Sequence, residues 1–564
     1  MPSLVAKTVR GRRYWQLITS RRVNGTPRQV VLAHLGTADA LLARLTQGAG
    51  RPHKAKVAAF GFLAALWTVA QRLALVETID REVPKRRQGA TVGEYMLLAA
   101  LNRLDTPTSK AGLAGWYQQT ALRRWLPLPQ LRSQRFWDHM AKLDEPAIRR
   151  IEAALAARLV AAFGLDLRCL CFDCTNFDTF LDSRTVSALA RRGHAKSKRD
   201  DLRVVGLALL VSTDFHVPLF SHVYPGNQAD AVTFGSVTEE LVARYRLLAR
   251  HLEHVTLVFD KGNNSQDNLE GLAESPYHVV GSLVPSQHPA LLAVPLRRFA
   301  ACADPRLAGV TAYRTTQTVF GRPWTLVVTR SAELLAGQLR GIAQQLAKRR
   351  RALAALQRKL ARSQRPGARG KGYTRASLGK HAAELRQGQY VSEILRITVA
   401  EHRGRLALRY RTEGAALGRL TRTVLGKRIL FTDNHDWTTE EIILAYRSQC
   451  QIEAAFREMK DPHGVSWDPR HHWTDQKIRV HAFYCVLALM LSSLLQRQAA
   501  QAGLALSLRR IRAELAAIQE VITLQPPAAG QRRGRPRGFI TYVDPGPEGA
   551  KLAALFDLNR LKVR

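Results

Sequence analysis

The spacing of hydrophobic residues changes several times along this chain, and each change marks a new segment. Up to residue 50, apolar and polar residues alternate around turns such as Asn24-Gly25, a pattern typical of short strands. From 51 to 163 the apolar residues recur with the period of a helix. The helical runs are 57–73, 92–104 and 147–163. We therefore expect a small β-rich element with a basic surface at 1–50 and a helical domain at 51–163.

Residues 164–285 carry short continuous apolar stretches instead. The predicted strands are 168–174, 203–212, 217–223 and 254–260, and the predicted helix is 230–250. Strands and helices mixed in this way are typical of a layered α/β domain. We assign the first part of such a domain to 164–285.

The next segment, 286–425, has the pattern of an insertion with strands and coiled-coil-like helices. Its heptad seam, interrupted by Arg349, consists of Leu339, Ile342, Leu346, Leu353, Leu356 and Leu360. Between Leu334 and Ala383 the chain has 13 Lys and Arg residues and no Asp or Glu. Because a solvated helix usually mixes charge signs, this one-signed charge favours contact with DNA.

A strand pattern at 428–432 returns the chain to the α/β type, and Thr438-x-x-Glu441 is a capping box that opens the next helix. A loop rich in Trp and His and an apolar helix at 478–496 follow. We assign 426–500 to the second part of the α/β domain, and 501–564 to a C-terminal helix and a basic tail.

The net charge points to a polyanionic partner. The 564 residues include 85 Lys and Arg against 45 Asp and Glu, for a net charge of +40 and a pI near 10.9. The helical domain, with Trp116, Arg124 and Trp125, is a candidate to grip a DNA duplex. The alternative is a helical scaffold with these tryptophans in its core.

A membrane is a poor candidate for that partner. No apolar run reaches 18 residues, and the nearest one, 480–495, contains His481 and fits a core helix better. The N-terminus lacks the apolar stretch of a secretion signal, and six cysteines are few enough to suit a reducing cytosol. Cys171-x-x-Cys174 has zinc spacing, but without a second pair it is better explained as core cysteines. We expect a cytoplasmic protein.

One predicted helix combines three kinds of functional side chain. Tyr446, Glu453 and Lys460 are each seven residues apart, nearly two helical turns, and therefore project from one face. That face offers a hydroxyl, a carboxylate that can bind metal, and a cation that can bind phosphate. These are the groups needed to cut a nucleic-acid backbone.

Two further carboxylates lie at the ends of predicted strands. Asp173 and Asp260 would sit at the rim of the sheet, where α/β layers commonly bind ligands, and the helix of Glu453 can pack on that sheet. Three carboxylates suit Mg²⁺ or Mn²⁺ rather than zinc, and two such ions about 4 Å apart can drive an in-line displacement. Either aspartate alone would be explained as a turn cap or an ion pair; the combination favours a metal site.

Five segments together resemble a known family. They are Phe-Asp-Cys-Thr-Asn at 172–176, Arg-Gly-His-Ala-Lys at 192–196, Tyr-Pro-Gly-Asn at 224–227, Phe-Asp-Lys-Gly-Asn at 259–263, and the helix at 446–460. This set is similar to the DDE transposases of bacterial insertion sequences, in the branch marked by a Tyr-x2-Arg-x3-Glu-x6-Lys helix. The resemblance implies an α+β multidomain protein whose ribonuclease-H-like mixed α/β core is interrupted by the insertion and preceded by a helical DNA-binding region.

The resemblance also implies roles for individual residues. Asp173, Asp260 and Glu453 would be the catalytic residues and the ligands of Mg²⁺ or Mn²⁺, with two ions expected. Tyr446 and Lys460 would contact DNA phosphates near the cut.

The chain departs from the family helix at one position. The arginine of the family falls on Gln449, while Arg447 lies two residues earlier and points elsewhere. Either Arg457 supplies the missing cation, or Gln449 makes a neutral contact to phosphate.

Members of this branch cleave DNA at terminal inverted repeats and transfer the strand to target DNA. Some members form a hairpin on the excised end. Hairpin formation needs a flipped base, and a flipped base needs an aromatic side chain to stack on. Trp324 is the candidate platform; core packing is its alternative.

In the tail, Arg533 and Arg535 belong to an Arg-Gly-Arg-Pro segment that resembles a minor-groove AT-hook, with a basic linker as the alternative.

Three functions remain open from the sequence. The first is a metal-dependent DNA transposase, which would act as a homodimer on double-stranded terminal repeats and target DNA in the bacterial nucleoid. The second is a nuclease or resolvase of related fold that cuts without joining. The third is a DNA-binding transposase relic, against which the presence of all three carboxylates counts.

Overall fold

The chain is divided into two compact units. The computed structural model describes residues 2–23, 26–46, 54–83, 89–230, 232–237, 240–241, 255–260, 266–273, 275, 277–368, 372–468, 471–525 and 537–563. The first unit comprises Met1–Ala65, Tyr117–Pro127 and Arg510–Arg564. The second comprises Leu66–Trp116 and Leu128–Arg509.

The first unit contains two antiparallel three-stranded sheets. One consists of β1 (Ser3–Val9), β2 (Arg12–Val23) and β3 (Thr26–Gly36), with α1 (Ala38–Thr46) after it. The alternating pattern at the start of the chain therefore correctly predicted strands, although the Asn24-Gly25 turn lies outside the described residues. The other sheet consists of β4 (Lys54–Ala59), β16 (Gln519–Gln525) and β17 (Arg537–Tyr542).

This second sheet differs from what the sequence predicted. We expected a helical region from residue 51, and a helix with a basic tail after 501, yet β4 pairs with β16 and β17 follows. The helices of this segment are α18 (Leu508–Ala516) and α19 (Pro547–Leu555). Arg124 and the fully buried Glu520 form an ion pair beside the sheet. Pairing between strands more than 450 residues apart leaves no local periodicity to detect.

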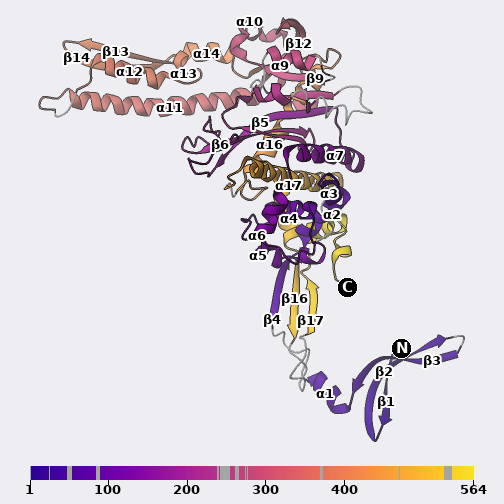
Figure 1. Cartoon of the computed structure of the whole chain (residues 1–564). Coiled ribbons are helices and arrows are strands. Elements are labelled where there is room, and N and C mark those ends of the chain that lie inside the picture. Colours follow the sequence, from indigo (N-terminus) through magenta and orange to yellow (C-terminus); the bar gives the residue numbers. More distant parts are fainter. Residues whose placement is uncertain are drawn as a thin grey trace. The chain divides into compact units, whose positions relative to one another are not determined.

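A helical layer occupies one side of the second unit (Figure 1). Its helices are α3 (Leu75–Glu82), α4 (Val92–Asp105), α6 (Ser133–Met140), α7 (Glu145–Phe163) and α17 (Asp475–Gln501), while α2 (Gly61–Arg72) and α5 (Leu113–Gln118) each belong partly to both units. Among the described helices, α17 alone is long and apolar enough to cross a membrane. Because 94% of its apolar window is buried inside the protein, it fits the core helix that the sequence predicted.

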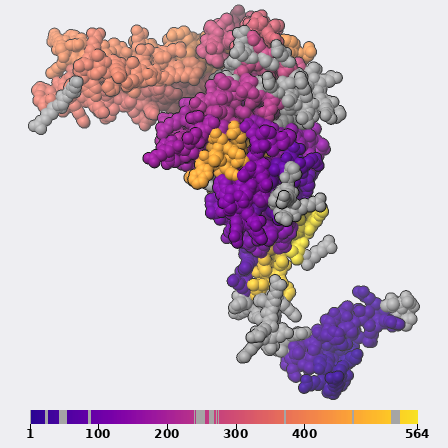
Figure 2. Space-filling model, viewed as in Figure 1, coloured from indigo at the N-terminus to yellow at the C-terminus, as the bar shows by residue number. Residues whose placement is uncertain are grey.

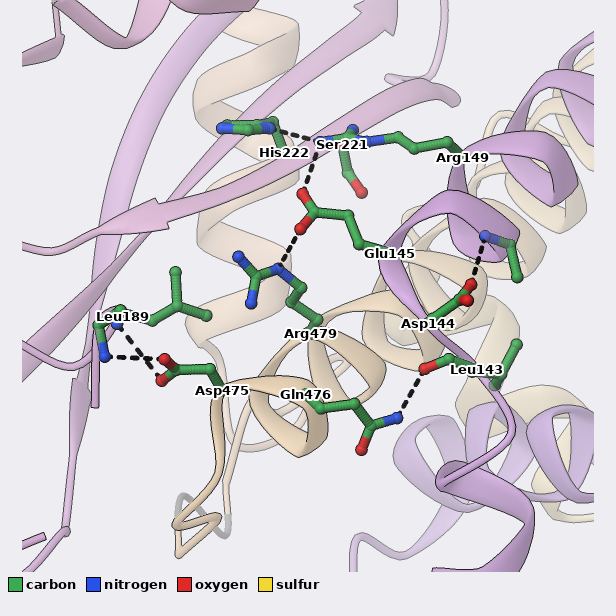
Figure 3. Close-up of polar contacts among 12 residues, drawn as sticks. Leu143, Asp144, Glu145, Arg149, Leu189, Ser221, His222, Asp475, Gln476 and Arg479 are labelled. Carbon is green, nitrogen blue, oxygen red and sulfur yellow. Dashed lines mark hydrogen bonds and ion pairs between the residues drawn. The ribbon is translucent and has the colours of Figure 1, made fainter. Parts of the chain in front are cut away.

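Polar contacts connect this layer to the sheet (Figure 3). The Asp475 carboxylate at the start of α17 accepts hydrogen bonds from the backbone N–H groups of Ala188 and Leu189, at 2.7 and 3.3 Å. Arg479, one turn later, lies 2.8 Å from the Glu145 carboxylate on α7. On the sheet itself, Arg149 of α7 donates hydrogen bonds to the Ser221 carbonyl and to His222 Nδ1 of β7 (Pro218–Pro225), so the helical layer packs against the sheet.

The second unit is built on a nine-stranded mixed sheet of order β10-β11-β12-β15-β9-β8-β5-β6-β7. Its strands are β5 (Cys169–Thr179), β6 (Arg203–Ser212), β7 (Pro218–Pro225), β8 (Val255–Val258), β9 (Tyr277–Leu283), β10 (Ala300–Ala301), β11 (Val310–Val319), β12 (Arg322–Ser331) and β15 (Lys427–Thr432). Strand β8 is parallel to both β5 and β9, and the other pairs are antiparallel. The mixed α/β class is therefore as predicted. The helix predicted at 230–250 falls largely outside the described residues.

The structure moves one predicted boundary. We expected an insertion from 286, yet β10, β11 and β12 extend the core sheet, because β12 pairs with β15. Only the part after Ser331 leaves the sheet as a separate arm (Figures 1 and 2). The arm contains α11 (Ala332–Ser363), α12 (Arg375–Arg386), α13 (Val391–Ile394), β13 (Leu395–His402), β14 (Arg405–Thr412) and α14 (Gly414–Thr423). Its buried leucines and isoleucines form a hydrophobic cluster of their own.

Candidate active site

Two of the predicted carboxylates meet on adjacent parallel strands. The register of β5 and β8 pairs Cys171 with Val258. Asp173 and Asp260 each come two residues later, so the same register places them side by side. Because side chains in register on parallel strands point to the same face, the two carboxylates share one face of the sheet.

Asp173 lies in an environment that disfavours its charge. Burial raises the pKa of its carboxyl to about 6, and the nearby Asp230 and Asp260 carboxylates raise it further, while the Lys196 ammonium lowers it. The Cys174 backbone N–H donates a 2.7 Å hydrogen bond to Asp173 Oδ1. A cation bound between the aspartates would relieve this crowding of like charges.

Asp260 is held by two hydroxyl groups. Its Oδ1 lies 3.1 Å from Tyr446 Oη and 3.2 Å from Ser282 Oγ, and these two hydroxyls are 2.9 Å apart. Burial, followed by the charge of Asp260, raises the pKa of the Tyr446 hydroxyl to about 12, so this group stays a neutral donor. Tyr446 therefore contacts a carboxylate here, whereas the family resemblance gave it a role toward phosphate.

The sequence missed one cation at this place. The guanidinium of Arg428 lies 5.0 Å from the centre of the Tyr446 ring, and Arg428 is exposed. Its position at the start of a predicted strand carried no signal of this contact, which depends on the packing of β15 beside α15 (Thr439–Arg447).

The helix that carries Glu453 is fastened along β5 at both ends. Ser448 Oγ, just before α16 (Gln449–Lys460), lies 3.2 Å from Cys171 Sγ. At the other end, Lys460 Nζ donates a 2.7 Å hydrogen bond to Thr175 Oγ1. Since Cys171, Asp173 and Thr175 alternate along one strand, all three face the helix.

These two anchors place Glu453 at the level of Asp173. Glu453 is five residues beyond Ser448, about 7.5 Å along a helix. Asp173 is two residues beyond Cys171, about 6.6 Å along a strand. Glu453 is exposed, and among the described residues no three His, Cys, Asp or Glu side chains are gathered closely enough to hold a metal ion. The structure therefore brings together two of the three predicted ligands, with the third on the helix above them.

The predicted helix is interrupted once. The capping box of Thr438 and Glu441 is present, but it opens α15, which ends at Arg447. Ser448 separates α15 from α16, and its backbone φ of −63° and ψ of −12° keep the chain close to helical. Glu453 and Lys460 share one face of α16, while Tyr446 reaches the site from α15.

Two further residues of α16 were predicted to contact DNA phosphates. Gln449 is half-buried at the start of α16, and Arg457 is exposed. Arg447 points elsewhere, as the sequence predicted, and donates a 2.7 Å hydrogen bond to the Arg306 carbonyl.

Two of the five sequence segments pack beside the first aspartate. Asn176 Nδ2 donates to the His194 carbonyl at 2.8 Å, and Asn176 Oδ1 accepts from the Lys196 N–H at 3.0 Å. Lys196 Nζ in turn donates to the Cys174 carbonyl and lies 3.7 Å from the Asp230 carboxylate. Segments 172–176 and 192–196 are thus joined by hydrogen bonds.

The glycines of these segments are required by close backbone approach. A Cβ on Gly193 would lie 2.4 Å from the Gly226 carbonyl oxygen, and one on Gly226 would lie 1.9 Å from the Val204 carbonyl oxygen. Segment 224–227 is therefore pressed against segment 192–196.

A pocket of about 270 Å³ opens next to the end of α16. It is lined by Asn176, Phe177, Asp178, Lys196, Ser197, Lys460, Trp467 and Asp468. The rings of Phe177 and Trp467 stack with centroids 4.0 Å apart, and Lys460 Nζ lies 5.2 Å from the Phe177 centroid. The sequence indicated Lys460 but missed Trp467, because a tryptophan in a loop has no periodic signal.

Other predictions do not lead to this site. Trp324 on β12 is buried, donates a 2.9 Å hydrogen bond to the Val319 carbonyl and packs edge-to-face on Phe431, so core packing explains it and it offers no platform to a base. Arg533 and Arg535 lie outside the described residues. Cys171 and Cys174 are buried free thiols, as the core alternative predicted.

One family model matches more than half of this chain. The family model described as a transposase DDE domain matches residues 166–491, a range that includes Asp173, Asp260 and Glu453. Among solved structures, a piggyBac transposase synaptic complex with hairpin DNA shares 8% sequence identity over 82% of each chain, with a TM-score of 0.37. The search of curated proteins found no match.

Proposed function

Since this chain belongs to the transposase DDE domain family, we propose that it cleaves DNA at the terminal inverted repeats of an insertion sequence and joins the 3′ ends to target DNA. The observation that carries the proposal is the pair of carboxylates, Asp173 and Asp260, side by side beneath the helix of Glu453. The net charge of +40 suits a nucleic-acid substrate.

The strand order supports a ribonuclease-H-like core. Strands β7, β6 and β5 form an antiparallel meander, and β8 and β9 continue the sheet on the other side of β5. This arrangement puts one carboxylate on the first strand and one at the end of the fourth, as the family resemblance implies.

The proposed metal ligands are carboxylates only, which fits Mg²⁺ or Mn²⁺. Asp173 and Asp260 would hold the ions together with Glu453, whose exposed side chain is open to a ligand. When bound, two divalent ions would activate the attacking water or 3′-hydroxyl and stabilise the leaving oxygen.

Protein groups around the carboxylates position them and the DNA. Tyr446 and Ser282 orient Asp260 through their hydroxyls. Lys460 and Lys196 place two ammonium groups at the rim of the pocket, where they can attract a phosphate of the cleaved strand. Gln449 and Arg457 lie on the same helix as further candidates for phosphate contact.

We extend the proposal to a homodimer in the DNA complex, because two transposon ends must be held together before joining. A protein of this kind would act on the bacterial nucleoid in the cytoplasm. Its DNA substrates would be double-stranded.

The decisive test is a joining assay. Purified protein, a labelled duplex carrying the terminal repeat, a plasmid target and Mg²⁺ are combined, with Asp173→Ala as the inactive variant. Asp166→Ala is the matched control, since Asp166 lies just before the same strand and, within the described part of the chain, its ion pair is with the exposed Arg168. Joined products from wild type and control, absent with Asp173→Ala, are expected.

Two other outcomes lead to the alternatives. Metal-dependent nicks without joined products, even with both ends supplied, would favour a nuclease or resolvase. DNA binding with no metal-dependent product would leave a transposase relic.

A further inference from the structure

The arm that leaves the core sheet ends in a two-stranded ribbon packed on a long helix. The inner face of the ribbon is apolar and belongs to the hydrophobic cluster of the arm, with Leu395, Ile397, Val399, Leu406, Leu408 and Tyr410. Gln357 of α11 and Gln364, the residue just after this helix, donate hydrogen bonds to the Leu408 and Leu406 carbonyls, at 2.7 and 2.9 Å. The ribbon is therefore fixed to the far half of α11.

The outer face of the ribbon carries positive charge and no carboxylate. Its cross-strand pairs are Arg396 with Arg411, Thr398 with Arg409, Ala400 with Ala407, and His402 with Arg405. All four arginines are exposed. The turn at Arg403 and Gly404 has φ values of 51° and 72° and closes the hairpin tightly.

The charges of this face are only partly balanced within the protein. Arg396 and Arg411 are the directly opposed pair of like charges, which alone would destabilise the two strands. Glu413, at 3.9 Å from Arg396 and 2.9 Å from Arg411, neutralises only that end of the ribbon. Within the described part of the chain, Arg405 and Arg409 make no ion pair. Arg409 and Arg405 face Thr398 and His402 across the ribbon, so their charges are open to an anionic ligand.

The chemistry of the face identifies the ligand. The arm, residues 332–425, has 21 Lys and Arg against five Asp and Glu, so it attracts a polyanion rather than a small anion. A two-stranded ribbon fits the major groove of B-form DNA, about 12 Å wide. The small central side chains Thr398, Ala400 and Ala407 permit close approach, and the arginines can reach phosphates or guanines from the ends.

We propose that the outer face of the β13–β14 ribbon docks in the major groove of duplex DNA, away from the site of cutting. The ribbon lies along the second half of the 32-residue helix α11, which begins where β12 leaves the core sheet. That corresponds to about 30–50 Å along the helix at 1.5 Å per residue. At 3.4 Å per base pair, this reach spans roughly 9–14 base pairs. The inference deepens the proposed function by naming a second, remote contact to the same kind of substrate.

Its test is a binding measurement that requires no cutting. The double variant Arg405→Gln/Arg409→Gln is compared with wild type by fluorescence anisotropy, in EDTA, on a 40-base-pair duplex at several salt concentrations. The matched control is Arg419→Gln/Arg422→Gln, which removes the same charge from α14 of the same arm.

We expect the ribbon variant to lose affinity by about tenfold or more and its salt slope to fall by about 2, one unit for each lost phosphate contact. The control should lose clearly less. The melting temperature of the ribbon variant should not fall, because Arg405 and Arg409 face His402 and Thr398 rather than a carboxylate. An affinity within twofold of wild type, or an equal loss in the control, would overturn the proposal.

Two further probes identify the groove and the source of the DNA. Duplex RNA has a deep, narrow major groove that side chains cannot read, so the variant and wild type should bind it equally; an equal loss on RNA would contradict groove docking. A loss confined to the terminal-repeat duplex would assign the ribbon to the transposon end, and a similar loss on unrelated duplex would assign it to DNA of any sequence. Because these assays contain no metal, they are independent of whether the protein cuts or joins DNA.

Discussion

At the scale of single residues, hydrogen bonds and neighbouring charges position the carboxylates of the site. Asp260 is fixed by Tyr446 and Ser282, and Asp173 is surrounded by Lys196, Asp230 and Asp260. Glu453 is the exposed member, and its position follows from two anchors at the ends of its helix. Two substitutions test separately the Glu453 carboxylate, which would bind metal, and the Tyr446 hydroxyl, which orients Asp260.

Replacing Glu453 with Gln is expected to leave DNA binding unchanged and to reduce Mg²⁺-dependent cutting by more than about 100-fold, because the neutral amide is a poor ligand for a hard cation. Cutting of the terminal-repeat duplex, with binding measured in EDTA, checks this. Glu458→Gln, on the same helix, is the control. Unchanged cutting by Glu453→Gln would remove this residue from the proposed triad.

Replacing Tyr446 with Phe removes the hydroxyl beside Asp260 while keeping the ring. We expect the Mg²⁺ concentration for half-maximal cutting to rise by about 10-fold, since groups that orient metal ligands typically contribute that much to affinity. A metal titration of the cutting rate measures it. If the maximal rate fell with no change in the metal requirement, Tyr446 would act on DNA, as the family resemblance implied.

At the scale of elements, close backbone contacts hold the sequence segments together. The Gly226 segment presses against β6 at Val204, and the loop at 192–196 rests on both Gly226 and Asn176. Helix α15 packs on β9, β12 and β15, and α16 packs on β5 and β6, so the two helices cover neighbouring parts of the sheet. These contacts explain why short segments far apart in the sequence form one site.

Replacing Gly226 with Ala is expected to destabilise the protein by about 1–3 kcal/mol or more, because the added Cβ would lie 1.9 Å from the Val204 carbonyl oxygen and the backbone has to shift. Urea unfolding measures the change. Gly115→Ala is the matched control, since a Cβ there has nothing within 4 Å and Ala favours its helix. Equal stability of the two variants would contradict the close approach at Gly226.

At the scale of the whole molecule, positive charge extends even into the protein interior. Arg103 is buried, and the half-buried Lys110 lies beside α17, where its Nζ donates a 2.7 Å hydrogen bond to Tyr484 Oη. Burial, reinforced by the charge of Arg103, lowers the pKa of Lys110 to about 7 from 10.5. Tyr484 also contacts His481, which is hydrogen-bonded to His472, so these polar side chains are joined in series.

This burial predicts a pH dependence of stability. Between pH 7 and 10.5 the unfolded chain keeps a proton on Lys110 that the folded protein has released. The contribution of Lys110 to the free energy of unfolding therefore rises with pH across this interval and is least favourable below pH 7. Urea unfolding at several pH values should show a steeper rise for wild type than for Lys110→Met. Parallel curves would place the ammonium in contact with water.

The sequence by itself determined the local features of this protein. Alternation and helical period predicted strands β1 to β3, β5 to β8 and β15, and the buried helix α17, because each pattern is set by which side of a single element meets the core. Asp173 and Asp260 could be placed at strand ends, and Glu453 in line with Lys460, for the same reason. The family was recognisable because five short segments retain the residues that the chemistry needs.

Only the tertiary structure decided which of these elements lie together. Pairing of β4 with β16, the extension of the core sheet by β10 to β12, the contact of Tyr446 with Asp260 and the position of Arg428 all join residues distant in the chain. Burial likewise made Trp324 a core residue and left the arginines of the β13–β14 ribbon exposed. Periodicity records the environment of one element, whereas these contacts depend on the register and packing between elements, which no single segment encodes.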